Sequence, residues 1–244
     1  MIALFTSMFT DTTPVLPAPW LMALARHAGW ALVLACLGYL VLRRGGLGTG
    51  YLPQRWRMAS VGGLAGLLAV AALWPGSAGL GYWLGLAFQI PSLTTVGLAA
   101  SVVVVAGTAL WTREPAHSQP LLSPGTVLCL SAAAVVLGWV MLLDTLALLP
   151  WFLYPWGYSA GAVAVLLALA VLLIALPASR SVGVAALLLA VVFVATRLPS
   201  GNLWDALSDP LLWLFAHGVL VRGLWQRRCA FTKFITKPPA PHRP

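Results

Sequence analysis

Seven long apolar stretches constrain this chain more than any other feature of its sequence. Each is close to the roughly 20 residues that a helix needs to cross a hydrocarbon core about 30 Å thick. Such runs are too long for barrel strands, and a single segment in lipid must satisfy its own backbone hydrogen bonds, so each stretch is expected to be helical. The sequence therefore predicts an all-α transmembrane bundle with spans at residues 20–42, 58–74, 92–111, 125–143, 159–177, 181–198 and 207–225.

The composition supports a membrane protein. Of 244 residues, 61% are hydrophobic and only 8% are charged, whereas charged residues make up about a quarter of a soluble domain. Seven spans leave no room for a sizeable soluble domain. We expect a short external N-terminal segment at 1–19, a seven-span domain at 20–225 and a basic, Pro-rich cytoplasmic tail at 226–244.

The basic residues indicate an orientation. All of them except Arg26 and Arg197 fall in the first, third and fifth connections or at the C-terminus. The positive-inside rule then places the N-terminus outside and the C-terminus in the cytoplasm, and it requires an odd number of spans. The net charge of +9 is thereby explained by topology, so no nucleic-acid partner is predicted. The compact, Ala-, Leu- and Arg-rich chain favours a bacterial inner membrane.

Aromatic residues cluster near the predicted outer boundary, where indole and phenol rings favour the lipid headgroup region. Residues 78–90 and 145–156 are too apolar to extend into water, and they are too short or too interrupted by Pro to span. We expect both segments to form short helices or turns on the outer membrane surface.

A set of polar residues is predicted to gather at the outer side. Arg26 lies within a span, where an ionisable group is costly and usually pairs or lines a cavity. Asp144 is the expected countercharge for Arg26, and Asp205 or Asp209 is the second choice. Arg197 is expected to reach headgroups or to pair with Asp205. A structural ion pair is the preferred interpretation, and an outward-facing binding or translocation site is the alternative. The candidate residues are Arg26, His27, Gln89, Asp144, Arg197, Asn202, Asp205 and Asp209.

Gly157-Tyr158-Ser159-Ala160-Gly161 spells GxSxG at the outer end of the fifth span, and His217 follows Ala216 in the seventh. This part of the chain resembles the rhomboid proteases, which use a Gly-x-Ser motif and an Ala-His pair on two membrane helices. The resemblance implies an intramembrane serine protease with a Ser159/His217 dyad, although no earlier span carries His and Asn at helical spacing. Gly157 and Gly161 also form a small-xxx-small face, and helix packing is the preferred interpretation.

His27 and His217 are the only histidines within the predicted spans. Two such residues could ligate a b-type haem between the first and seventh helices, which gives a second alternative function. Neither cysteine pairs nor other metal-ligand spacings occur. The preferred prediction therefore includes no cofactor and no metal.

The sequence predicts a non-enzymatic integral membrane protein, either a small permease or a membrane subunit of a larger assembly. The expected partners are the lipid bilayer, a second membrane protein or another copy of the chain, and anionic lipids at the basic tail. A faint internal repeat is also present, because Ser60-Val61-Gly62 followed by LLAV resembles Ser181-Val182-Gly183 followed by LLAV. Duplication is conceivable, but coincidence is favoured in a chain of this composition.

Overall fold

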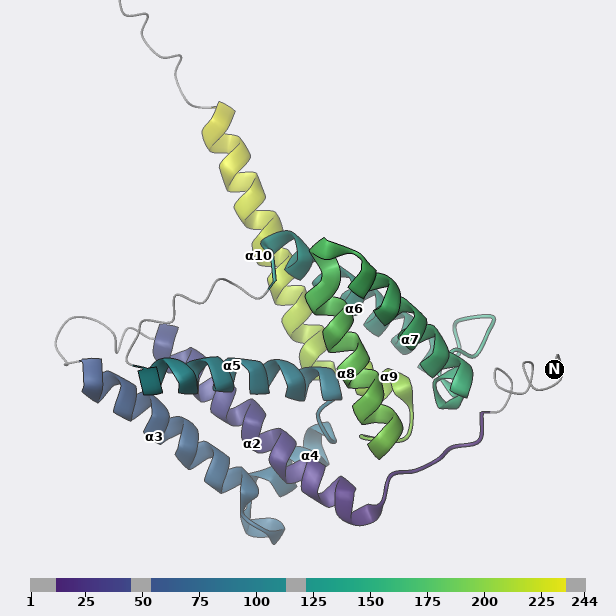
Figure 1. Ribbon diagram of the computed structural model, residues 1–244, viewed down its shortest axis with the longest axis horizontal. Coiled ribbons are helices and arrows are strands. Elements are labelled where there is room, and N and C mark those ends of the chain that lie inside the picture. Colours follow the sequence, from purple (N-terminus) through teal and green to yellow (C-terminus); the bar gives the residue numbers. More distant parts are fainter. Residues whose placement is uncertain (1–11, 45–53, 113–121, 236–244) are drawn as a thin grey trace, which may run out of the picture.

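A computed structural model describes residues 12–44, 54–112 and 122–235. Within these ranges every regular element is a helix, as predicted, and the seven long helices coincide with the seven apolar stretches (Figure 1). Their bounds are α2 Pro19–Arg44, α3 Gln54–Leu73, α5 Leu93–Thr112, α6 Pro124–Thr145, α7 Ala160–Ala175, α8 Arg180–Thr196 and α10 Pro210–Ile235.

Among the described residues, three segments are both long enough and apolar enough to cross a membrane, namely Pro19–Leu42, Pro124–Thr145 and Pro177–Thr196. Gly62–Leu73, Leu93–Thr108 and Ala160–Ala175 are shorter apolar helices. This set of helices is compatible with a membrane-embedded protein. The number of spans and their orientation stay predictions.

The two predicted interfacial segments contain no long helix. The first holds α4 (Leu80–Phe88), which follows the 3₁₀ helix η1 (Gly76–Ala78), and the second consists of turns that lead into η2 (Pro155–Tyr158). Another short helix, α9 (Leu203–Leu207), connects α8 to α10, and η3 (Pro177–Ser179) connects α7 to α8.

The helix α10 continues through Ile235, past the end predicted for the seventh span at residue 225. The first part of the predicted tail is therefore helical. Residues 1–11 of the predicted external segment, residues 236–244 of the tail, and the connections 45–53 and 113–121 lie outside the described residues.

The helices form two groups, which Figure 1 shows on either side of the molecule. In the first group α2 packs against α3, α4 and α5. Its core contains Trp30, Ala72 and Ala99, which come from three different helices. The Trp30 indole also donates a hydrogen bond to the Gln89 carbonyl at 3.0 Å, which fixes the end of α4 against α2.

The second group comprises α6 to α10. Here α7 packs against α8, and α9 caps them with Leu203 and Ala206 in a core that also holds Phe193. A separate pair is formed by α6 and α10. The Trp213 indole of α10 lies against Gly138, where any Cβ would overlap the ring.

Hydrogen bonds join the connections to one another at one end of the bundle, which we call the loop end. It comprises the start of α2 and residues 74–92, 145–159 and 197–209. The Ser92 amide donates to Asp209 at 2.7 Å, and Asn202 Nδ2 donates to the Tyr154 carbonyl at 2.9 Å. Successive long helices therefore alternate in direction.

Candidate functional site

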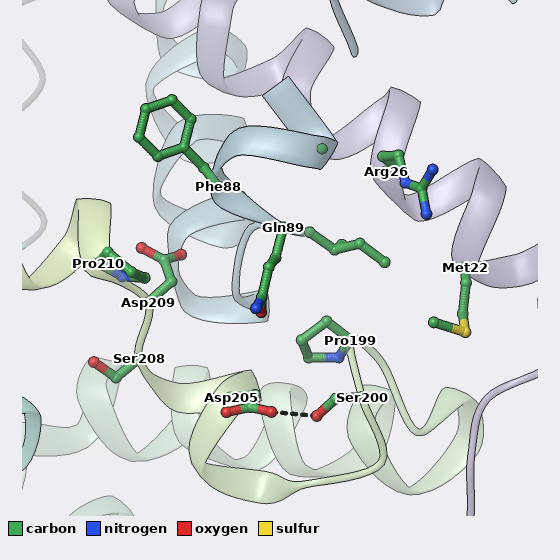
Figure 2. A pocket seen from close by; sticks show the side chains of 12 residues that line it. Met22, Arg26, Phe88, Gln89, Pro199, Ser200, Asp205, Ser208, Asp209 and Pro210 are labelled. Carbon is green, nitrogen blue, oxygen red and sulfur yellow. Dashed lines mark hydrogen bonds between the residues drawn. The ribbon is translucent and has the colours of Figure 1, made fainter. Parts of the chain in front are cut away.

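A cavity of about 280 Å³ opens at the loop end, between the two helix groups (Figure 2). The start of α2 and the end of α4 form one wall, while α9 and its flanking residues form the other. Four of the predicted site residues line it. The full lining comprises Met22, Arg26, Gly85, Phe88, Gln89, Ile90, Pro199, Ser200, Asp205, Ser208, Asp209 and Pro210.

Arg26 supplies the positive charge of this cavity. Its Nε atom is buried and has no hydrogen-bond partner, and no salt bridge joins Arg26 to any carboxylate in the described parts of the chain. Gly85 of α4 faces the aliphatic part of the arginine, and a Cβ at this position would overlap Cδ and Cγ. The close approach of α4 therefore holds the Arg26 side chain in place without neutralising its charge.

Asp205 supplies one negative charge on the opposite wall. Its Oδ2 atom accepts hydrogen bonds from the Tyr154 hydroxyl at 2.9 Å and from the Ser200 hydroxyl. Among the described residues, no donor contacts Oδ1. One carboxylate oxygen is thus fixed by the protein, and the other is available to a ligand in the cavity.

Tyr154 holds Asp205 from outside the cavity. Burial, together with the neighbouring Asp205 carboxylate, raises the pKa of Tyr154 well above its ordinary value. The phenol therefore stays protonated and continues to donate to Asp205.

This shift predicts a pH dependence of stability. The folded pKa of Tyr154 exceeds the unfolded value of about 10, so its contribution is complete below about pH 10 and is lost as the pH rises further. The difference in unfolding free energy between the wild-type protein and Tyr154→Phe should therefore be constant near neutral pH and should decrease above about pH 10. Equilibrium unfolding in detergent at several pH values measures this difference, and a constant difference throughout would contradict the assignment.

Asp209 has a different role, because both of its oxygens bind backbone amides. Oδ1 accepts from Leu212 N at 2.7 Å, which caps the start of α10, and Oδ2 accepts from Ser92 N at 2.7 Å. Asp209 therefore joins α10 to the start of α5. The carboxylate of Asp209 lines the cavity, but both of its oxygens already accept hydrogen bonds from these amides.

Gln89 ends α4 in a backbone conformation that residues other than glycine rarely adopt, with φ 64° and ψ −160°. Such a conformation costs on the order of 1 kcal/mol, and the hydrogen bond from Trp30 to the Gln89 carbonyl maintains it. The side chain extends into the cavity between the two walls (Figure 2).

The predicted pairing of Arg26 with Asp144 is wrong. Asp144 is 7% exposed and lies outside the cavity, where its oxygens accept from Leu153 N at 3.1 Å and Tyr154 N at 2.7 Å. Both amides belong to the connection that follows α6, and they donate to the carboxylate at the end of that helix. Asp144 therefore orders the connection between α6 and α7.

The predicted pairing of Arg197 with Asp205 is also wrong. Arg197 ends α8 in the left-handed region, with φ 58°, and its guanidinium lies over the Phe193 ring at 5.6 Å. The cation is therefore placed by its own helix end and stacked on an aromatic face. Asn202, which is fully buried, bonds the Trp204 amide and the Tyr154 carbonyl and is part of the scaffold.

The two histidines have separate structural partners. His27 Nδ1 hydrogen-bonds the Ala72 carbonyl at 3.0 Å and joins α2 to α3, and His217 Nδ1 bonds the Trp213 carbonyl at 2.8 Å. The His217 ring packs edge-on against Trp213 and Trp139. No interaction between described residues joins His27 to His217, and the haem alternative gains no support from their placement.

Ser159 is fully buried, and its hydroxyl accepts a hydrogen bond from Ala162 N at 3.2 Å. It is the N-cap of α7, which explains a serine at this position. Ser159 makes no hydrogen bond to His217 in the described structure. The geometry therefore gives no support to the protease alternative.

Several cavity residues were not predicted from the sequence. Ser200 and Ser208 are polar residues in the short connection that holds Asp205, so their neighbourhood offered some signal. The apolar lining residues, Met22, Phe88, Ile90, Pro199 and Pro210, resemble dozens of others in the chain. Only the three-dimensional packing distinguishes them.

Comparison with protein-family models, with curated proteins and with solved structures finds no match to this chain. Its function must therefore be inferred from the cavity and the helices that form it.

Proposed function

We propose that the chain is a seven-span bacterial inner-membrane protein whose loop end faces outward and binds a small polar solute. It acts as a small permease or as the solute-binding membrane subunit of a larger assembly. The distribution of basic residues supports this orientation. Arg43 and Arg44 end α2, Arg55 and Arg57 begin α3, and Arg180 begins α8, all at helix ends opposite to the loop end.

The observation that carries the proposal is the unpartnered guanidinium of Arg26 at the wall of a cavity. The Arg26 side chain is half-buried, and an ionisable group within a predicted span normally pairs with another group or lines a cavity. Here a carboxylate, Asp205, lies across the cavity and keeps one oxygen free. Charges held apart around an open space are typical of a binding site, whereas a structural pair would be in contact.

The outer faces of the helices support the proposed lipid or protein partners. Only 6% of the apolar stretch of α6 is buried within the protein. Val136 and Trp139 on that helix are 62% and 48% exposed. Patches of this kind mark contact with lipid or with another membrane protein. We assign the basic tail to anionic lipids of the inner leaflet.

Cysteine labelling tests the orientation and the accessibility of the cavity together. Ser208 lines the cavity, and its hydroxyl makes no hydrogen bond among the described residues. In a variant with Ser208→Cys and the three native cysteines replaced by Ala, a membrane-impermeant maleimide should label the protein in intact spheroplasts. A second variant that keeps only the native Cys229 should be labelled only after permeabilisation.

A buried serine provides the control for this experiment. Ser131 lies within α6 and is 9% exposed, so Ser131→Cys on the same background should stay unlabelled in intact and permeabilised spheroplasts. Labelling of Cys229 in intact spheroplasts would reverse the orientation. Absence of labelling at position 208 under both conditions would show that the cavity is closed to solutes.

A further inference from the structure

We propose that the cavity recognises a zwitterion, with the anionic group of the ligand on Arg26 and its ammonium group on Asp205. This inference rests on the proposed function, because it requires that the cavity bind a solute. It goes further by stating the chemical class of that solute and the role of each wall.

The Arg26 wall selects an anion. A guanidinium presents a planar set of N–H donors that matches a carboxylate or a phosphate, and no hydrogen bond or ion pair joins Arg26 to another described residue. Because Gly85 confines the aliphatic part of the side chain, the guanidinium is already positioned before a ligand arrives. A ligand anion in the cavity would accept from the Nη groups, because Nε is itself buried.

The Asp205 wall selects an ammonium group. Of the two carboxylates that line the cavity, Asp209 uses both oxygens on backbone amides. Asp205 uses only Oδ2, on the hydroxyls of Tyr154 and Ser200. Asp205 therefore retains an acceptor for an N–H donor and is held in a fixed position while it accepts one.

The positions of the charges, rather than their sum of one negative charge over Arg26, Asp205 and Asp209, disfavour ligands with a single charge. A simple cation would satisfy Asp205 and leave Arg26 unpaired, while it added a second positive charge to the same small space. A simple anion would satisfy Arg26 but would face the carboxylates of Asp205 and Asp209. Only a ligand that carries both charges offers a partner to Arg26 and to Asp205 at the same time.

The size and lining of the cavity limit the ligand further. A volume of about 280 Å³ lies at the small end of ligand pockets. Met22, Phe88, Pro199 and Pro210 are apolar and line the space around the polar groups. They fit a short hydrocarbon segment between the two charged ends, as in a free amino acid or in the phosphoethanolamine headgroup of a lipid.

Calorimetric titration of the purified full chain tests this inference. The protein is placed in nanodiscs of phosphatidylglycerol and titrated with glycine, 4-aminobutanoate and 6-aminohexanoate. Butanoate and butylamine provide the singly charged comparison. At least one zwitterion should bind about tenfold or more tightly than either singly charged compound, as expected when one charge-assisted hydrogen bond is lost.

Two substitutions assign the ends of the ligand. Arg26→Gln should remove the preference for the zwitterion over butylamine, and Asp205→Asn should remove its preference over butanoate. Arg197→Gln is the matched control, because Arg197 lies at the same end of the bundle but stacks on Phe193 outside the cavity. It should change neither preference.

The outcomes separate this inference from the proposed function. If butanoate or butylamine binds as tightly as every zwitterion, the zwitterion inference is overturned while solute binding stands. If none of the five compounds binds, the proposed function and the inference both fail. Nanodiscs that also contain phosphatidylethanolamine distinguish the source: weakened binding of the soluble zwitterion would assign the cavity to the lipid headgroup, and unchanged binding would assign it to a free solute.

Discussion

Asp144→Ala should lower the free energy of unfolding by about 3 kcal/mol, because it would leave two part-buried backbone donors without an acceptor. The Asp144 carboxylate is 7% exposed and accepts from Leu153 N and Tyr154 N. These bonds hold the connection whose Tyr154 hydroxyl then binds Asp205. Unfolding of the purified protein with increasing SDS in mixed micelles measures the effect.

A conservative variant separates charge from geometry at this position. Asp144→Asn keeps one acceptor oxygen, so it should lose about half as much stability as Asp144→Ala. If both variants unfold like the wild-type protein, the two amides are satisfied in another way and Asp144 does not order this connection. If Arg26→Gln showed the same loss as Asp144→Ala, a link between the two charges would have to be reconsidered.

Gly183→Ala should separate α7 from α8 and destabilise the protein by about 2 kcal/mol. An added Cβ would lie 2.6 Å from Ile174 N and 2.7 Å from the Ala170 carbonyl oxygen. Both are backbone atoms of α7, so they cannot be relieved by a change of rotamer. The helices would have to move apart and would lose contacts around Phe193 in the same core.

A glycine with open surroundings provides the matched control. Gly63 lies within α3 and has nothing within 4 Å of an added Cβ, so Gly63→Ala should leave stability unchanged or raise it by up to about 1 kcal/mol through helix propensity. The same SDS titration measures both variants. Equal effects of the two substitutions would show that the approach of α7 and α8 at Gly183 is not tight.

The positions of the helices could be predicted because each long apolar run produces a long helix. The errors are at the ends, and the largest is α10, which continues to Ile235. Residues 226–235 (QRRCAFTKFI) include three basic residues among apolar ones, so they fall below the hydropathy by which the spans were recognised. Helical backbone continues there without an apolar signal.

The candidate site could be predicted in part. Arg26 lies within α2, Gln89 follows α4, and Asp205 and Asp209 belong to the connection between α8 and α10. The structure places these four residues around one cavity. Polar residues of an apolar chain gather where its helix ends meet. The pairing of charges could not be predicted, because backbone amides near the chain's own turns compete for the carboxylates, as at Asp144.

The faint repeat falls on equivalent elements. Its two copies lie on α3 and α8, and each of these helices is followed by a short helix, α4 or α9, before the next long one. The repeated Val70 and Val191 are 57% and 55% exposed, and Ala69 and Ala190 both face a core. A common ancestry of these segments stays a hypothesis, but α4 and α9 both contribute residues to the cavity.

The division of the cavity between two helix groups has a mechanical consequence. The cation belongs to α2 in one group, and the free carboxylate belongs to α9 in the other. A zwitterion bound to both would act as a tether across the gap, and its length would set how far apart the groups stand. A molecule too short to reach both charges would leave the gap unbridged, and one too long would act as a wedge. The distance between the two helix groups would thus depend on the length of the bound ligand.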